Sequence, residues 1–299
     1  MIEFQPVRKE DKAVLDPFFR AQYYENSHYN FTTVYIWRNP FHMQWAIDDS
    51  VLFMKAEWQG KKMLLSPFGP ADKMAEAVQK QIEWAKSNDV PFYAYGIEEK
   101  MVPVYEAASG IKLTARANRD EADYLYNTQD LIKLSGRKYH SKKNHLNAFW
   151  RQYPEAEYLP ITEDIVPECK LNMNGWYKEL QQETPDDPYI ATERESVMEI
   201  LSDLEYFKLK GAAIRIGKRI IAFTLGEQLN KDTVVVHIEK GAPDIRGAYT
   251  VINQSFLEHE WSEFPYVNRQ EDMGLEGLRT AKESYRPVRM IQKYIIEPA

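Results

Sequence analysis

Residues 211–260 read GAAIRIGKRIIAFTLGEQLNKDTVVVHIEKGAPDIRGAYTVINQSFLEHE. Three runs rich in apolar and β-branched residues, at 211–216, 220–228 and 233–239, predict three successive strands. A Gly-Lys-Arg turn joins the first two strands, and a loop containing glycines leads from the third into a helix expected near 248–260. This stretch therefore predicts an antiparallel meander that ends in a helix.

The first half of the chain has the same order of elements. It predicts a strand near 2–6, a helix near 9–24, three strands at 43–48, 51–58 and 61–68, a helix near 72–87, a strand at 91–95, a helix near 98–109 and strands at 112–117 and 123–127. In the second half, helices near 161–182 and 192–210 precede the meander, and a strand near 265–268, a helix near 275–284 and a strand at 288–296 follow it. We therefore expect an α/β (α+β) protein of two domains, residues 1–128 and 129–299. Each should be a mixed, mostly antiparallel sheet flanked by helices.

Composition limits the class of protein. The 299 residues are 44% hydrophobic and 28% charged, enough apolar material for a sizeable core. The first twelve residues include several charges and lack the apolar stretch of a signal peptide, and no apolar run approaches the length of a membrane helix. We therefore expect a cytoplasmic protein without a membrane span. A net charge of -7 argues against a surface that coats DNA. The single cysteine, Cys169, is expected to be a packed thiol.

A basic segment interrupts this acidic chain. Between residues 131 and 151 there are six lysines and arginines and no acid. The segment is expected to form a helix on which Lys138, Lys142 and His145, at i, i+4 and i+7, form one cationic line. A charge run is usually a solvated face, but the absence of acids favours a phosphate or carboxylate partner, such as a tRNA acceptor stem or a phosphorylated small molecule. The candidate residues for that contact are Lys138, His140, Lys142, Lys143 and His145.

Two segments resemble a known family. Residues 133–154, KLSGRKYHSKKNHLNAFWRQYP, and 266–294, YVNRQEDMGLEGLRTAKESYRPVRMIQKY, are similar to soluble relatives (the DUF2156 type) of the C-terminal domain of phosphatidylglycerol lysyltransferase. Those proteins resemble tandem GNAT acyltransferase domains, also seen in the Fem aminoacyl-ligases. Residues 104–113, VYEAASGIKL, look like the end of a generic GNAT domain.

The resemblance implies an activity. Members of this class move an acyl or aminoacyl group from acyl-coenzyme A or aminoacyl-tRNA to an amine or hydroxyl. It implies a working site in the second domain, with the first domain as a degenerate, supporting copy. No permanently bound cofactor is expected. The expected partners are a small-molecule or peptide acceptor, with tRNA as a candidate.

GNAT architecture also implies where the donor binds. It lies where two central strands separate, with its phosphates on a helix N-terminus. The corresponding loop is 240–250, and the candidate donor contacts are Lys240, Gly241, Arg246, Gly247 and Ala248. Asp244 occupies a position where this family class usually has Gln or Arg. An ordinary surface loop is the alternative.

Three residues are candidates for acid–base chemistry. His237 and Glu239 are two apart on a predicted strand, hence on one face, and either is a candidate general base. Tyr285 ends a predicted helix, where the resemblance implies a general acid for the leaving group. The alternatives are a solvated polar pair on the strand and a packed tyrosine at the helix end.

A polar stretch after the strand at 265–268 is the candidate acceptor site. Its residues are Asn268, Arg269, Glu271 and Asp272, with Lys282 in the next helix. Glu271 or Asp272 would bind an ammonium group, and Arg269 a carboxylate. We find no metal-ligand spacing, no P-loop and no Ser–His–Asp pattern, so no metal is expected. The rival hypothesis is a non-catalytic protein that binds an anion through the basic segment.

Overall fold

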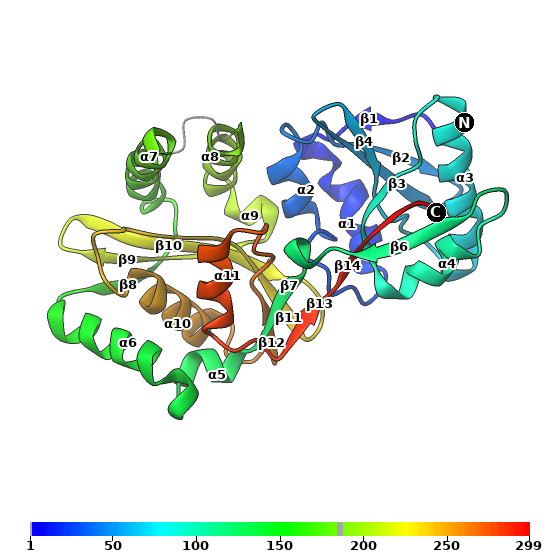
Figure 1. Ribbon diagram of the computed structural model, residues 1–299. Coiled ribbons are helices and arrows are strands. Elements are labelled where there is room, and N and C mark those ends of the chain that lie inside the picture. Colours follow the sequence, from blue (N-terminus) through cyan, green and yellow to red (C-terminus); the bar gives the residue numbers. More distant parts are fainter. Residues whose placement is uncertain (1, 184–187) are drawn as a thin grey trace. The chain divides into compact units, whose positions relative to one another are not determined.

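The computed structural model describes residues 2–183 and 188–299, and the side chains of 178–192 are not described. The chain forms two compact units (Figure 1). Unit 1 contains Met1–Asp123, Glu271–Gly274 and Ile291–Ala299, and unit 2 contains Tyr124–Gln270 and Leu275–Met290. Each unit is built on its own sheet.

Unit 1 contains sheet A, with strand order β1-β2-β3-β4-β5-β14-β6. The strands are β1 (Gln5–Pro6), β2 (Gln44–Asp48), β3 (Val51–Trp58), β4 (Lys61–Leu64), β5 (Ala94–Glu98), β6 (Leu113–Ala117) and β14 (Lys293–Pro298). All pairs are antiparallel except β4 and β5, which are parallel. Helices α1 (Lys12–Arg20), α2 (Phe31–Trp37), α3 (Met74–Ser87) and α4 (Val102–Glu106) flank the sheet. Four consecutive buried residues, 51–54, show that helices or loops cover both faces of β3.

Unit 2 contains sheet B, with order β13-β7-β12-β11-β10-β9-β8. The strands are β7 (Asp123–Asn127), β8 (Glu157–Pro160), β9 (Lys210–Ile216), β10 (Arg219–Gln228), β11 (Thr233–Gly241), β12 (Tyr266–Asn268) and β13 (Arg289–Ile291). The helices are α5 (Thr128–Lys133), α6 (His140–Gln152), α7 (Val166–Glu183), α8 (Pro188–Leu201), α9 (Leu204–Phe207), α10 (Ala248–Glu260) and α11 (Glu276–Glu283). The pair β11–β12 is parallel, and the meander β9–β10–β11 is antiparallel.

Helix α10 is the centre of the unit 2 core. Nine of its residues are buried, and it packs against β9, β10 and β11 on one face of the sheet (Figure 1). Helix α7 packs on β10 from the other face, where the rings of Trp176 and Phe223 stack at 5.9 Å. Helix α6 contributes Leu146 and Phe149 to the core, and Trp150 packs against it.

The predicted fold class is confirmed: the two sheets are mostly antiparallel, each includes one parallel pair, and helices flank them. The predicted bounds of the helix at 248–260 are those of α10. The expected single strand at 288–296 is in fact two strands. β13 joins sheet B and β14 joins sheet A. A continuous run of strand-forming residues does not reveal which sheet each part enters.

The division into units differs from residues 1–128 and 129–299 for the same reason. β14 inserts between β5 and β6, so Ile291–Ala299 belongs to unit 1, together with Glu271–Gly274. Conversely, β7 falls within the predicted first domain, yet it pairs with β12 of sheet B. Among the described residues, no helix is both long enough and apolar enough to cross a bilayer.

Candidate functional site

The candidate site of unit 2 begins where β11 and β12 separate. The two strands pair from Thr233–Tyr266 to Val235–Asn268, and β12 then ends. β11 continues to Gly241 and a short loop leads into α10. Gly247, at the N-cap of α10, has a φ of 92° and provides no side-chain cap. The first amides of a helix have no intrahelical acceptor and lie at its positive end, so this terminus suits an anion.

Glu239, Arg269 and Tyr285 meet at this point of separation. Arg269 Nη2 donates to Glu239 Oε1 at 2.6 Å, and the guanidinium lies 4.8 Å from the centre of the Tyr285 ring. Asn253 Nδ2 donates to the other oxygen, Glu239 Oε2, at 3.0 Å. Tyr285 Oη donates to Thr250 Oγ1 at 3.3 Å. Burial raises the pKa of Tyr285, so its hydroxyl keeps its proton at neutral pH.

Cations of α6 and of the loop between β11 and α10 lie near this cluster. Lys142 Nζ is 4.1 Å from the centre of the Tyr285 ring, and Arg246 Nη2 is 3.3 Å from His145 Nε2. Burial and the charge of Arg269 lower the pKa of Lys142. Burial, followed by the charges of Arg246 and Lys142, lowers the pKa of His145. These positive groups lie close enough to repel one another. A bound anion would offset that repulsion and favour their charged forms.

Comparison with known proteins now gives the family. The family model described as "Phosphatidylglycerol lysyltransferase, C-terminal" matches residues 20–297. The chain belongs to the phosphatidylglycerol lysyltransferase C-terminal family. The recognition made from the two sequence segments is therefore confirmed.

Three proteins are similar to this chain. A conserved protein of unknown function from Bacteroides thetaiotaomicron VPI-5482 is 31% identical, with a TM-score of 0.91 over 100% of both chains. The C-terminal domain (DUF2156) of a putative lysylphosphatidylglycerol synthetase from Agrobacterium fabrum is 15% identical, with a TM-score of 0.68 over 96% of this chain and 91% of that chain. An uncharacterised protein of Mycoplasmoides gallisepticum is 26% identical over 181 residues, which are 60% of this chain. The match spans 57% of the length of that curated relative.

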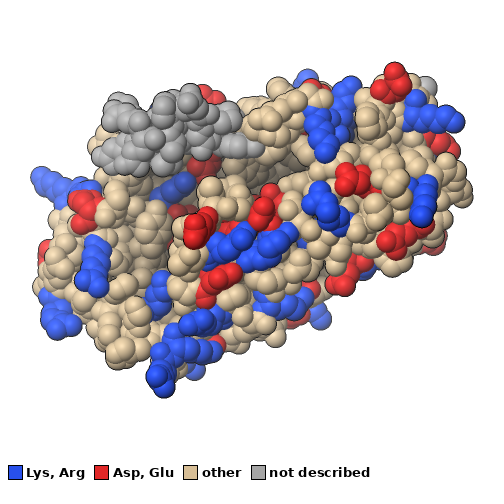
Figure 2. All heavy atoms as spheres, in the orientation of Figure 1, with Lys and Arg blue, Asp and Glu red and all other residues tan. Residues whose placement is uncertain are grey.

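The remaining basic residues of this family member lie apart from the cluster or at its margin. Lys138 precedes α6 and pairs with Asp130 at 2.9 Å. His140 is exposed at the first residue of α6, and Lys143 is half-buried one residue after Lys142. Figure 2 shows Lys and Arg side chains grouped along the edge where Figure 1 places α5 and the start of α6. Lys142 and His145 are thus the members of the basic segment that contact the other candidate residues.

The donor loop is only partly as expected. Lys240 pairs with Glu193 of α8 at 3.1 Å and lies 5.0 Å from the centre of the Tyr177 ring, so its charge is already neutralised. Asp244 pairs with Arg219 at 2.8 Å. Gly241 is buried against Tyr249, where an added Cβ would lie 3.1 Å from a ring carbon. Ala248 is buried as the first residue of α10. Arg246 and the α10 N-terminus remain the candidate anion contacts of the loop.

His237 and Glu239 both belong to β11, but their side chains have different hydrogen-bond partners. Its side chain is only 1% exposed. Nε2 lies 3.0 Å from Glu227 Oε1, and Nδ1 lies 3.5 Å from Gln270 Nε2. Sequence reasoning missed Glu227. Its signal was an acid inside the apolar run IIAFTLGEQ, where a charge is retained only with a partner.

The predicted acceptor residues divide between the two units. Arg269 lies in the unit 2 cluster, where it binds Glu239. Asn268 is fully buried, and its Oδ1 accepts from the Gln270 amide. Lys282 donates to the backbone carbonyls of Arg269 and Gln270, so it stabilises the turn after β12.

Glu271 and Asp272 belong to unit 1. The carboxylate of Glu271 binds the ammonium of Lys293 at 2.9 Å, and that of Asp272 binds Arg119 at 2.9 Å. Both acids therefore hold cations of the chain itself, although the sequence suggested that they hold the acceptor.

Glu271 is also part of the set of potential metal ligands in unit 1. His28, Glu121 and Glu271 offer ligand atoms within 4.8 Å of one another. The Lys293 ammonium, which is fully buried, lies 2.9 Å from both Glu271 Oε2 and His28 Nε2 and 2.7 Å from Asp123 Oδ1. An ammonium in this position repels a divalent ion, so Lys293 acts as the internal cation of this group.

The corresponding place in unit 1 is filled by aromatic side chains. β4 and β5 share one pair, Leu64–Ala94, and the chain after β4 turns back so that Phe68 bridges to Leu52. The rings of Phe19, Tyr24 and Tyr29 surround Phe68 at 4.8–5.6 Å. Tyr105, the tyrosine of the GNAT-like ending, is fully buried and donates to Gln81 Oε1. Aromatic packing therefore occupies the end of β4 in unit 1.

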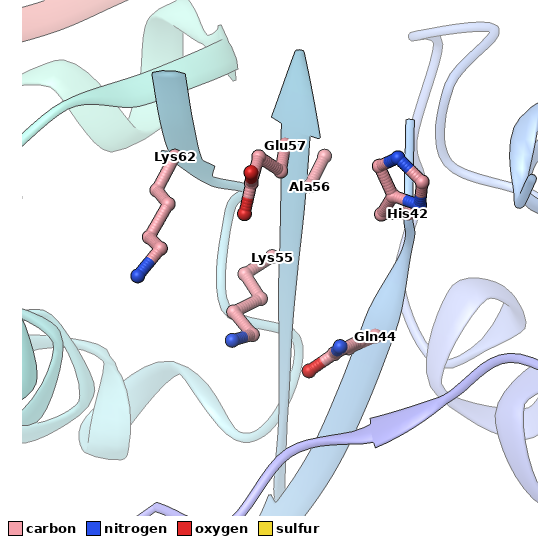
Figure 3. Close-up of a pocket in the computed structure, with 6 residues that line it drawn as sticks. All are labelled: His42, Gln44, Lys55, Ala56, Glu57 and Lys62. Carbon is pink, nitrogen blue, oxygen red and sulfur yellow. The ribbon is translucent and has the colours of Figure 1, made fainter. Parts of the chain in front are cut away.

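A small cavity in unit 1 is unrelated to these clusters. Its lining side chains come from β2, β3, β4 and the residue His42 (Figure 3). Its volume of about 20 Å³ corresponds to one water molecule. It therefore holds no metabolite.

Proposed function

We propose that this protein transfers an acyl or aminoacyl group to an amine or hydroxyl at the unit 2 site. The observation that carries the proposal is the position of Tyr285: a protonated hydroxyl at the point where β11 and β12 separate, with Arg269 and Lys142 against its ring. Family membership supports the reaction class, because the family description names a lysyltransferase.

The cationic groups support a position for the donor. Its phosphates would lie at the N-terminus of α10, close to Arg246, His145 and Lys142. Acyl-coenzyme A and aminoacyl-tRNA both carry phosphate groups that could bind there. The neutralised Lys240 weakens the contact that a pyrophosphate would make in the loop.

Each group then has a role in the transfer. The acceptor nitrogen or oxygen attacks the carbonyl carbon, a new C–N or C–O bond forms, and negative charge develops on the carbonyl oxygen. Arg269 stabilises that charge. When the bond to the leaving sulfur or oxygen breaks, Tyr285 donates its proton to the leaving atom. The proton lost by the acceptor restores Tyr285. Glu239 holds Arg269 in place, since both of its oxygens already accept hydrogen bonds from the chain.

Tyr285→Phe tests the proposal. The purified protein is first screened for thermal stabilisation by coenzyme A, acetyl-coenzyme A and aminoacylated tRNA, because a ligand that binds only the folded state raises its melting temperature. Transfer is then measured with the ligand that stabilises it. We expect Tyr285→Phe to reduce turnover about a hundredfold or more while leaving ligand binding intact. Tyr153→Phe, in a half-buried tyrosine after α6, is the matched control.

A second candidate function rests on the cations alone. Within the described residues no carboxylate pairs with Lys142, so the site can bind an anion without chemistry. Under this alternative, the protein binds the ligand and shows no transfer, and Tyr285→Phe has no effect on anything but stability. Measurable transfer that survives Tyr285→Phe at the wild-type rate contradicts the assignment of Tyr285.

A further inference from the structure

Lys55 of β3 is a cation without an acid partner. Its side chain is half-buried, and its ammonium lies 5.1 Å from the centres of the Phe4 and Trp84 rings. Among the described side chains, no carboxylate lies close enough to form an ion pair with it. The rings exclude water from the ammonium. A lysine that loses water without gaining a counter-charge is shifted toward its neutral form.

A second lysine lies on the same face of sheet A. Gln44 of β2 is opposite Lys55, and Lys62 of β4 is opposite Glu57. Residues two apart on a strand share a face, so Lys55 and Lys62 are diagonal neighbours there. Figure 3 shows their side chains extending in the same direction from neighbouring strands. Burial first, and then the charge of Lys62, lower the pKa of Lys55, and the charge of Glu57 offsets this only in part.

Lys55 also lines the small cavity of Figure 3, together with Gln44, Glu57 and Lys62. Its volume of about 20 Å³ is room for one water molecule, so a carbonyl oxygen can take the place of that water but a metabolite cannot enter. Gln44 supplies an amide N–H for such an oxygen. The cavity is therefore suited to the reacting end of a reagent that approaches Lys55 from solvent.

We propose that Lys55 is a site of N-acylation by acyl phosphates, with Lys62 as the contact for the phosphate. A neutral lysine amine is a nucleophile, and both burial and a neighbouring cation activate it. An acyl phosphate carries negative charge next to its electrophilic carbonyl, so the Lys62 ammonium attracts the part of the reagent that leaves. This modification is separate from the transfer proposed for unit 2 and does not depend on it.

The step balances without another reactant. The neutral nitrogen of Lys55 attacks the carbonyl carbon, and a C–N bond forms. The bond between that carbon and the phosphate oxygen breaks, and its electron pair stays on the oxygen. The proton released by the amine passes through water to the phosphate, which leaves as hydrogen phosphate. The product is an uncharged amide, so the repulsion between Lys55 and Lys62 ends.

Acetyl phosphate is the probe, and the full chain is the sample. After a short incubation at neutral pH, digestion and mass spectrometry give the acetylation rate at each lysine. Lys80 is the internal reference, because it pairs with Asp48 at 2.7 Å and with Glu76 at 3.0 Å and so keeps its proton. We expect Lys55 to be acetylated several-fold faster than Lys80. A rate at Lys55 equal to or below that at Lys80 overturns the proposal.

Two variants test the role of Lys62. Lys62→Gln removes the charge that repels the Lys55 ammonium and contacts the phosphate, so the rate at Lys55 should fall several-fold. Lys61→Gln is the matched control, because Lys61 is the preceding residue of β4 and its ammonium lies 3.2 Å from the centre of the Tyr93 ring. Its loss should leave the rate at Lys55 unchanged. Melting curves show that each variant is folded, and equal effects of the two variants contradict the assignment of Lys62.

A neutral reagent separates the phosphate contact from the reactivity of the amine. The ester p-nitrophenyl acetate acetylates amines and carries no phosphate. We expect the preference for Lys55 over Lys80 to be larger with acetyl phosphate than with this ester, and inorganic phosphate should reduce the preference only with acetyl phosphate. The same preference with both reagents overturns the assignment of acyl phosphates. All of these measurements concern unit 1, so their failure leaves the transfer proposed for unit 2 untouched.

Discussion

Arg269 Nη2 and Glu239 Oε1 lie 2.6 Å apart and join the residue after β12 to the second half of β11. Their side chains are 12% and 11% exposed, so this ion pair is largely withdrawn from water. It spans the place where the two parallel strands stop pairing. The ion pair therefore links β11 to the residue after β12 at a point where the two strands no longer share backbone hydrogen bonds.

Glu239→Gln should weaken both stability and turnover. The amide keeps a group that accepts from Asn253 but leaves the Arg269 guanidinium buried without a counter-charge, which costs about 3 kcal/mol. Urea unfolding measures this loss. Glu157→Gln, in the exposed ion pair with Arg215, is the control and should change stability little. An unchanged urea midpoint for Glu239→Gln would show that Arg269 is stabilised by other groups.

Anion binding should strengthen as the pH falls. The pKa of His145 is lowered from 6.5 by burial and by Arg246 and Lys142, and a bound anion offsets that repulsion and favours the protonated ring. Affinity for inorganic pyrophosphate should therefore rise as the pH falls below about 6.5, and His145→Gln should remove this rise. Calorimetry across pH 5 to 8 is the measurement. A flat profile for wild type means that His145 does not face the anion.

The same shift has the opposite effect on the free protein. Because the folded state holds the pKa of His145 below its unfolded value, the unfolded chain binds the proton more readily in that range. The contribution of His145 to the free energy of unfolding is thus lost as the pH falls below about 6.5. Comparing wild type with His145→Gln in thermal melts at pH 5.5 and pH 7.5 isolates this contribution.

Cys169 should be unreactive in the folded protein. The thiol is fully buried, and burial raises its pKa to about 12, so almost no thiolate forms at neutral pH. A thiol-specific disulfide reagent should modify it only after denaturant is added, and the rate should follow unfolding. Rapid modification under native conditions contradicts the burial of α7 on the sheet.

Lys293→Met should strongly destabilise unit 1. Lys293 is the ammonium between two acids, Asp123 and Glu271, and its removal takes away the charge that neutralises them, at a cost of about 3–5 kcal/mol. The double variant with Glu271→Gln should recover part of this loss, because one negative charge is then removed. Urea unfolding of the two variants decides the point. If the double variant is no more stable than the single one, Glu271 is not a principal partner of Lys293.

Much of the fold could be predicted because it rests on local patterns. Residues 211–260 show two strand turns and a helix start in the sequence itself, and the structure has these elements. Helix α2 was missed. Its residues, FTTVYIW, are β-branched and aromatic and favour a strand. Burial and the N-cap Asn30, which accepts from the Thr33 amide at 2.8 Å, make it a helix.

The sequence predicted several residues of the candidate site, but it did not predict which of them contact one another. Glu239, Arg269 and Tyr285 were identified separately from their positions at strand and helix ends, and the structure brings them together. Asn253 and Thr250 were not identified, although polar residues three apart on an otherwise apolar helix face were a visible signal. The pairing of Lys293 with Glu271 could not be predicted, because it depends on which sheet receives the last strand.

The position of β14 has a consequence for synthesis on the ribosome. Residues 293–298 form an interior strand of sheet A, between β5 and β6, yet they are translated only after the whole of unit 2. Until then, the facing edges of β5 and β6 have unsatisfied backbone groups, which invite pairing with other nascent chains. Sheet A therefore cannot be completed until residues 293–298 have been synthesised. Truncation before Lys293 would leave that exposed state permanent.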